Sequence, residues 1–183
     1  MRLKDRVVFI TGASRGIGRA IALACAREGA DIVVAAKTDV ETNPRLPGTI
    51  HSVAAEVEAL GRKALPIKLD VRDGEACEAA VNKAIAHFGR LDVLVNNAGA
   101  LWWADVTATP LKKFDLVMGI NVRATFALSQ AALPKMIEQA AKEHEQPAPT
   151  IAPSRFGCHI GAGLIAAEEN ELTGALVTAR AAD

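Results

Sequence analysis

The chain has 183 residues, half of them apolar, which is enough for one hydrophobic core and predicts a single domain over residues 1–183. Its 21 lysine and arginine residues balance 21 aspartate and glutamate residues, so no net field attracts a nucleic acid or an anionic membrane. Three cysteines without CxxC spacing argue against a disulfide framework and lead us to expect a reducing, cytoplasmic location. No secretory leader pattern and no uninterrupted apolar run of about 18 residues is present, so we expect no membrane insertion.

Short apolar runs and helical stripes alternate through residue 95. Runs rich in β-branched residues that end at polar or glycine residues predict strands at 7–10, 31–36, 64–69 and 91–95. Apolar residues at helical spacing predict helices at 17–28, 50–60 and 77–88. This alternation predicts an α/β fold, a doubly wound parallel sheet covered by helices on both faces. Ligands of such sheets bind at the carboxyl ends of the strands.

The pattern changes after the fourth predicted strand. Thr109-Pro110 is typical of an N-cap followed by proline at the first helical position, and it predicts a long helix to about residue 141 that Pro134 kinks. A polar segment with three prolines then interrupts the alternation. Residues 138–183 are therefore an atypical tail on the regular pattern of residues 1–137.

The sequence TGASRGIG joins the first predicted strand to the first predicted helix. Its glycines, Gly12, Gly16 and Gly18, let the backbone turn tightly and approach a ligand, and the helix that follows offers free N–H groups to a phosphate. The position between a strand and a helix is the one that a dinucleotide-binding turn requires. The alternative is a tight turn that binds nothing. The segment is not a P-loop, because it lacks the GK[ST] ending.

Lys37 and Thr38 follow the second predicted strand, where an acidic residue would bind the ribose 2′-hydroxyl of NAD. A cation and a hydroxyl suit a 2′-phosphate instead, and Arg15 in the glycine turn supplies a second positive charge. The sequence therefore favours NADP over NAD. The alternative is that Lys37 is a solvated loop residue.

Asp70 and Val71 end the third predicted strand, where a carboxylate could accept a hydrogen bond from an adenine amino group. The alternative is a capping role at the helix that begins near Asp73-Gly74.

Four motifs together resemble the short-chain dehydrogenase/reductase family: TGASRGIG, the Asp-Val pair at 70–71, NNAG at 96–99, and Asn121 within GINVRATF. The residues between these motifs most closely resemble the hydroxysteroid-dehydrogenase-like branch of the family. The resemblance covers residues 6 to about 137 and implies a Rossmann-type sheet, shortened here on the catalytic side. It also implies a nicotinamide cofactor and a small carbonyl or alcohol substrate, with no metal site.

The resemblance assigns roles to individual residues. Asn121 matches the active-site asparagine that holds a water in a proton relay, although an asparagine that bonds local backbone at a helix bend is equally compatible. The implied cofactor contacts are Gly12, Ser14, Arg15, Gly16, Ile17, Gly18, Lys37, Thr38, Asp70, Val71, Asn97, Ala98 and Gly99.

The family's chemistry also needs a tyrosine that exchanges a proton with the substrate oxygen, and a lysine four residues beyond it. Residues 1–183 contain no tyrosine, and the last lysine is Lys142. Ser154, His144 and His159 are not evident substitutes, since the histidines are typical of solvated positions. We therefore expect negligible turnover of the family type.

The tail resembles the end of the family fold over residues 153–179, as if the catalytic middle had been removed; a change of coding frame would explain the break equally well. A sheet that ends at its fourth strand exposes an edge, which residues 175–178 could repair. The long helix would also lack its usual neighbour, so we expect a homo-oligomer. For Trp102 and Trp103 we favour packing over substrate recognition.

Three hypotheses follow. The chain is an NADP-dependent oxidoreductase of the short-chain type, an inactive cofactor-binding or interaction module, or a gene remnant that folds poorly.

Overall fold

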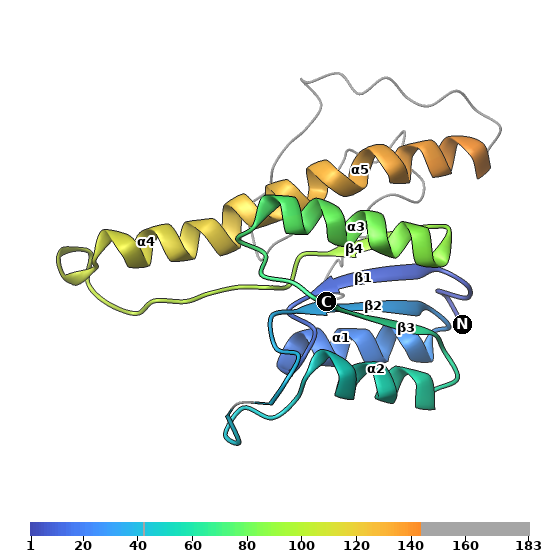
Figure 1. The fold of residues 1–183 in the computed structure, drawn as a ribbon, viewed down its shortest axis with the longest axis horizontal. Coiled ribbons are helices and arrows are strands. Elements are labelled where there is room, and N and C mark those ends of the chain that lie inside the picture. The colour runs from blue at the N-terminus through green and yellow to red at the C-terminus, as the bar shows by residue number, and fades with distance from the viewer. Residues whose placement is uncertain (42, 144–183) are drawn as a thin grey trace, which may run out of the picture.

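The computed structural model describes residues 1–41 and 43–143, and its elements follow the predicted alternation closely (Figure 1). The first seven are β1 (Val7–Thr11), α1 (Gly16–Arg27), β2 (Asp31–Ala36), α2 (Ile50–Ala59), β3 (Ala64–Lys68), α3 (Gly74–Phe88) and β4 (Val93–Val95). A short 3-10 turn, η1 (Val106–Ala108), leads to α4 (Leu111–Met118), the π-helical turn η2 (Gly119–Arg123) and α5 (Ala124–Glu143).

The four strands form one parallel sheet in the order β3-β2-β1-β4. In its register Phe9 lies opposite Val33 of β2 and Leu94 of β4, so β1 has a hydrogen-bonded neighbour strand on each side. Because every strand runs the same way, all four carboxyl ends lie at one edge of the sheet. The doubly wound α/β prediction is therefore confirmed.

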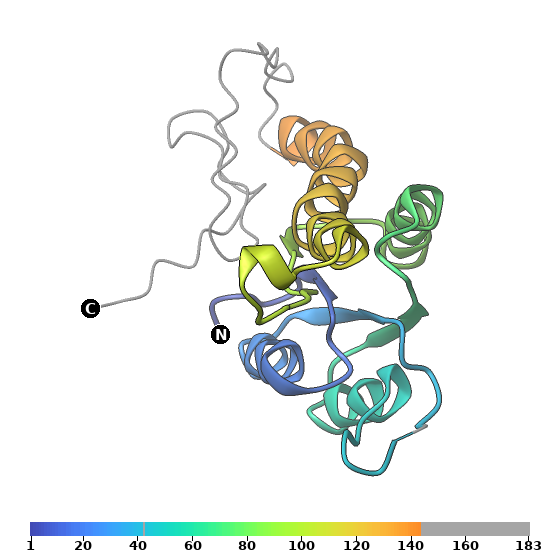
Figure 2. The same ribbon diagram turned by 90° about the vertical axis from the view of Figure 1, so that its left-hand side faces the viewer.

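Helices cover both faces of the sheet (Figure 2). The side chains of β1 alternate between the faces, as a strand requires. Val7 and Phe9 pack in a cluster with α3 and α5, whereas Val8 and Ile10 pack in a second cluster with α1 and α2. Burial on both faces explains why the strands are continuous apolar runs.

The long helix differs from the prediction at its start and in its middle. Pro110, with extended backbone, is the N-cap of α4, and Thr109 instead donates its hydroxyl to the Asp105 carbonyl at 2.9 Å. The prediction of a Thr109 cap is wrong because proline fixes φ but leaves ψ free to stay extended. Pro134 lies inside α5, whose helical run passes through it unbroken. The irregularity is the π turn at η2, which no sequence pattern indicated.

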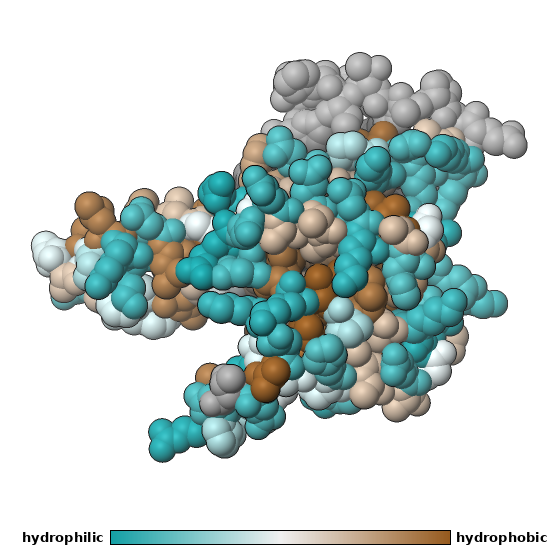
Figure 3. All heavy atoms as spheres, in the orientation of Figure 1, coloured by the Kyte–Doolittle hydropathy of each residue, from teal (hydrophilic) through white to brown (hydrophobic). Residues whose placement is uncertain are grey.

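Large apolar side chains are exposed on α4 and the segment before it, which project from the body of the molecule as an arm (Figures 1 and 3). Trp103 is 89% exposed and Trp102 is 44% exposed, so neither is buried within the chain, and their packing in an interface stays a prediction. Lys113 places its ammonium 4.2 Å from the centre of the Trp102 ring, a cation–π contact. The homo-oligomer stays a prediction.

One helical run among the described residues, Leu111–Glu143, has the length and composition to cross a bilayer, and 28% of its most apolar window is buried. The sequence expectation considered only uninterrupted apolar runs, whereas this window also contains polar residues. A core helix of a water-soluble fold meets the same criterion.

Within residues 1–41 and 43–143, β4 pairs only with β1 and forms an edge of the sheet. The segment predicted to repair this edge, 175–178, lies outside the described residues, as do Ser154, His144 and His159 and all of the predicted tail except residues 138–143, which end α5.

A buried carboxylate anchors the amino-terminal ends of the strands, the side of the sheet away from their carboxyl ends. Asp92 is 4% exposed and accepts hydrogen bonds from the Val7 N–H at 2.8 Å, from Arg6 at 2.9 Å and from Arg90. Gln139 of α5 also donates to it at 3.1 Å. Burial alone would raise the pKa of Asp92, but the hydrogen bonds from Arg90, Val7 and Arg6 together outweigh burial and hold the pKa below its usual value. Asp92 therefore ties the start of the sheet to the end of α5.

Asp92→Asn removes the charge that two arginines and a backbone N–H share, so we expect the free energy of unfolding in urea to fall by about 2 kcal/mol at pH 7. The loss should shrink as pH falls below about 3.9, the unfolded pKa, because a depressed folded pKa stabilises only above that value. Glu138→Gln, which removes an exposed carboxylate paired with Lys142, is the control and should leave the free energy of unfolding nearly unchanged. Equal losses for the two variants would contradict the anchoring role.

Candidate dinucleotide site

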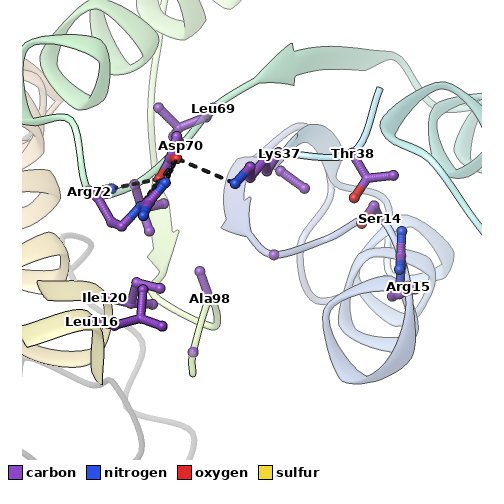
Figure 4. Close-up of a pocket in the computed structure, with 14 residues that line it drawn as sticks. Ser14, Arg15, Lys37, Thr38, Leu69, Asp70, Arg72, Ala98, Leu116 and Ile120 are labelled. Carbon is purple, nitrogen blue, oxygen red and sulfur yellow. Dashed lines mark hydrogen bonds and ion pairs between the residues drawn. The ribbon is translucent and has the colours of Figure 1, made fainter. Parts of the chain in front are cut away.

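A cavity of about 300 Å³ opens at the carboxyl edge of the sheet, where ligands of doubly wound folds bind (Figure 4). Residues that follow each of the four strands line it, together with two from the long helix. They are Gly12, Ser14, Arg15, Ala36, Lys37, Thr38, Leu69, Asp70, Val71, Arg72, Ala98, Gly99, Leu116 and Ile120.

The predicted cofactor residues divide into those that line this cavity and those beside it. The lining set is Gly12, Ser14, Arg15, Lys37, Thr38, Asp70, Val71, Ala98 and Gly99. The residues beside it are Gly16, Ile17, Gly18 and Asn97. Sequence reasoning missed Ala36, Leu69, Arg72, Leu116 and Ile120. A signal existed for the last two, because Leu116 and Ile120 are four residues apart and share a helix face next to Asn121.

The glycine turn has the geometry that its sequence predicts. Gly12 has φ +65° and Gly16 has φ +57°, values that residues with a Cβ rarely adopt. Gly18 serves a different purpose, because a Cβ there would overlap the Gly12 carbonyl oxygen and lie 2.6 Å from Asn97 Nδ2. Gly18 therefore allows α1 to approach the end of β1, and the turn depends on this close contact.

Asn97 and Thr11 brace this turn from the side of β4. The Asn97 side-chain amide donates to the Thr11 carbonyl at 2.8 Å and to the Gly12 carbonyl at 3.3 Å. The Thr11 hydroxyl, 1% exposed as a residue, accepts from the backbone N–H groups of Asn97 and Ala98, both at 3.0 Å. The structure thus places Asn97 as a support of the turn. Sequence reasoning did not single out Thr11, whose role depends on a contact 86 residues away.

Arg15 joins the glycine turn to the loop between β2 and α2. Its Nη2 donates to the Gly48 carbonyl at 3.0 Å, and Gly48, with φ +108°, lies so close that a Cβ would come within 2.5 Å of the Ser14 carbonyl. The Arg15 Nε is buried without a hydrogen-bond partner among the described residues. A buried cationic N–H without an acceptor costs free energy that an anionic ligand in the adjoining cavity would recover.

The N-terminus of α1 adds to this positive character. No side chain caps α1, whose N-cap is Arg15, and no acidic residue lies in its first turn. The first N–H groups and the helix dipole therefore favour an anion there. Together with the orphaned Arg15 Nε and the space that Gly12 and Gly18 leave, this fits the pyrophosphate of a dinucleotide.

Lys37 and Asp70 meet in the lining of the cavity. Lys37 is 72% exposed at its side chain, and its Nζ lies 3.8 Å from Asp70 Oδ2. Asp70 is held mainly by Arg72, and hydrogen bonds from that arginine lower the pKa of Asp70 to about 2. Asp73, not Asp70, caps α3, because its side chain accepts the Ala76 N–H at 3.0 Å. The alternative of a capping role thus applies to Asp73 and leaves Asp70 at the cavity.

Asn121 lies in the π turn, and its side chain bonds the backbone of Ala100, 21 residues away. Its Oδ1 accepts the Ala100 N–H at 2.8 Å and its Nδ2 donates to the Ala100 carbonyl at 2.9 Å. This two-point contact holds the segment after β4 against the long helix. Each polar atom of the amide makes one hydrogen bond, to backbone 21 residues away and not to the local backbone that the alternative interpretation named. π turns are frequent at functional sites.

A model of the short chain dehydrogenase family matches residues 6–143. The chain belongs to this family. Hydroxysteroid dehydrogenase-like protein 2 of Xenopus tropicalis is 54% identical over 133 residues, which are 73% of this chain and 32% of that protein. The chain thus spans about a third of the length of the relatives it matches.

Solved structures agree with the fold. A putative dehydrogenase from Xanthomonas campestris is 48% identical with a TM-score of 0.72, and the match covers 75% of this chain and 50% of that one. A short chain dehydrogenase from Mycobacterium paratuberculosis bound to NAD is 34% identical with a TM-score of 0.70, covering 76% of this chain and 54% of that one. The family uses nicotinamide dinucleotides. This chain covers about half the length of each of these two solved structures.

Gly18→Ala should lower the free energy of unfolding by about 1–3 kcal/mol, because the added methyl group must push α1 away from the Gly12 carbonyl. Gly74→Ala is the matched control, since a Cβ at Gly74 meets nothing within 4 Å. That control should be neutral or slightly stabilising in a helix. Urea unfolding of both variants checks this, and equal stability would show that the close approach is not needed.

Proposed function

We propose that this chain binds NADP in the cavity at the carboxyl edge of the sheet. The observation that carries the proposal is the buried Arg15 Nε without an acceptor, beside the uncapped N-terminus of α1 and the glycine turn. These groups would hold the pyrophosphate. Family membership and a relative bound to NAD support the class of cofactor.

The remaining lining residues suit the other parts of the cofactor. Lys37 and Thr38 would bind the 2′-phosphate, since a mobile ammonium and a hydroxyl both donate to phosphate oxygens. Asp70 and Val71 would contact the adenine. Ala98 and Gly99, at the end of β4, would adjoin the nicotinamide ribose.

When bound, the nicotinamide supplies a hydride donor or acceptor, which the family uses on carbonyl or alcohol substrates. The residues of this chain would bind and orient the cofactor. Asn121 would hold the segment that lies beside its reactive end, through the two hydrogen bonds to Ala100.

Two functions are compatible with NADP binding. The first candidate is hydride transfer as an oxidoreductase of the family type. The second candidate is an inactive NADP-binding or interaction module. It is favoured by one observation, the lack of any tyrosine in residues 1–183. Positioned acid catalysis contributes about 10²–10⁴ to a rate, and its loss alone would leave turnover very low.

Lys37→Ala should weaken NADPH binding about tenfold, because one charge-assisted contact to the 2′-phosphate is lost, and should change NADH binding less than about twofold. Fluorescence titration with both cofactors measures this. Lys63→Ala, an exposed lysine at the amino-terminal edge of the sheet, is the control. Equal effects of Lys37→Ala on both cofactors would contradict the assignment to the 2′-phosphate.

Hydride transfer separates the two candidates. With NADPH and a panel of aldehydes, ketones and steroids, the change in absorbance should show no turnover near the 1–10³ per second that is roughly usual for enzymes. Turnover in that range would establish the oxidoreductase and refute the inactive module.

A further inference from the structure

Arg72 lines the cavity beside Asp70 and Lys37 and has no role in the proposed binding mode (Figure 4). Its guanidinium holds both oxygens of Asp70, with Nε 2.9 Å from Oδ1 and Nη2 2.5 Å from Oδ2. The Arg72 backbone N–H also donates to Oδ1 at 3.2 Å. Lys37 makes only one, longer contact with the same carboxylate, at 3.8 Å. Two cations thus surround one acid, and they hold it very unequally.

The Asp70–Arg72 pair is fixed from both sides. The Arg72 carbonyl accepts from Arg123 Nη1 at 3.1 Å, which ties it to the π turn, and the Asp73 N–H donates to the Asp70 carbonyl at 3.1 Å. Within the described part of the chain, Lys37 makes no comparable contact, and its side chain is 72% exposed. Arg72 is therefore the partner that stays on Asp70, and Lys37 is the one able to leave it.

The charge balance has a consequence for a phosphate at this end of the cavity. A phosphate monoester carries about −1.5 to −2 charges at pH 7, so an unscreened carboxylate beside it would repel it. Asp70 does not escape this by protonation, because its pKa lies near 2. Without Arg72 the carboxylate would also pair with Lys37 and cancel its charge. With Arg72 in place, the cluster of three keeps one net positive charge.

We propose that Arg72 is a specificity-determining positioning residue, which neutralises Asp70 and so leaves Lys37 free to bind the 2′-phosphate of NADP. Its Nε and Nη2 are bound to Asp70, and the role that we assign to Arg72 needs no contact with the phosphate. This inference rests on the proposed NADP function and adds the residue that makes the cofactor preference possible.

The test uses the full chain and four variants, titrated with NADPH and with NADH at low ionic strength, where screening is weak. Arg72→Gln should weaken NADPH binding about fivefold and change NADH binding less than about twofold. In the double variant D70N/R72Q the acid that needed screening is gone, so the ratio of NADPH to NADH affinity should return to within about twofold of that of the unmodified chain. Arg72→Lys keeps the charge and should stay within about threefold.

Arg27→Gln is the control for net charge, because Arg27 is an exposed arginine at the far end of α1. It should change neither affinity. Circular dichroism shows whether each variant is folded. If Arg72→Gln is unfolded, the comparison of NADPH with NADH affinity rests on Arg72→Lys.

Other results would overturn the inference. A loss with Arg72→Gln that D70N/R72Q does not recover would mean that Arg72 contacts the phosphate itself. Equal losses for NADPH and NADH would mean a structural role. If the unmodified chain binds both cofactors but Arg72→Gln leaves the ratio of NADPH to NADH affinity unchanged, the proposed function survives and this inference fails. If it binds neither, the proposed function fails and this inference with it.

Discussion

The close approach of α1 to the end of β1 is the constraint on which the site depends. Gly18 lies against the Gly12 carbonyl, and Asn97 donates to the same stretch of backbone from the end of β4. These contacts fix where the first helix starts and therefore where its free N–H groups point. The cavity, the orphaned Arg15 Nε and the loop at Gly48 all lie around this point.

The amino-terminal and carboxyl ends of the strands have different roles in the structure. At the amino-terminal edge, Asp92 gathers Arg6, Arg90 and Gln139 and fastens α5 to the sheet, where satisfied charges stabilise the fold. At the carboxyl edge, the Arg15 Nε and the first N–H groups of α1 remain available among the described residues. This separation leaves a candidate cofactor site in the described part of the chain, although the chain matches only about half the length of the solved family structures.

The elements could be predicted because strands buried on two faces are continuous apolar runs and the covering helices repeat apolar residues every three or four positions. The glycine turn and Lys37 were also predictable, since they adjoin strand ends. Thr11, Arg72 and the π turn were not, because their roles arise from contacts with distant segments or from backbone geometry that no local pattern encodes. Whether Trp102 and Trp103 are covered depends in the same way on a neighbouring element or chain, which no local pattern encodes. The place of Asn97 after the fourth strand could be predicted from the sequence. Its role in bracing the glycine turn is evident only from its contacts with Thr11.

Amide chemical shifts of the isotopically labelled chain, recorded while NADPH is added, test the central claim most directly. The account predicts saturable shifts that are largest for the N–H groups of Gly12 to Gly18 and decrease with distance from the carboxyl edge of the sheet. Unchanged signals in that turn, or saturable shifts confined to another face of the molecule, would contradict it.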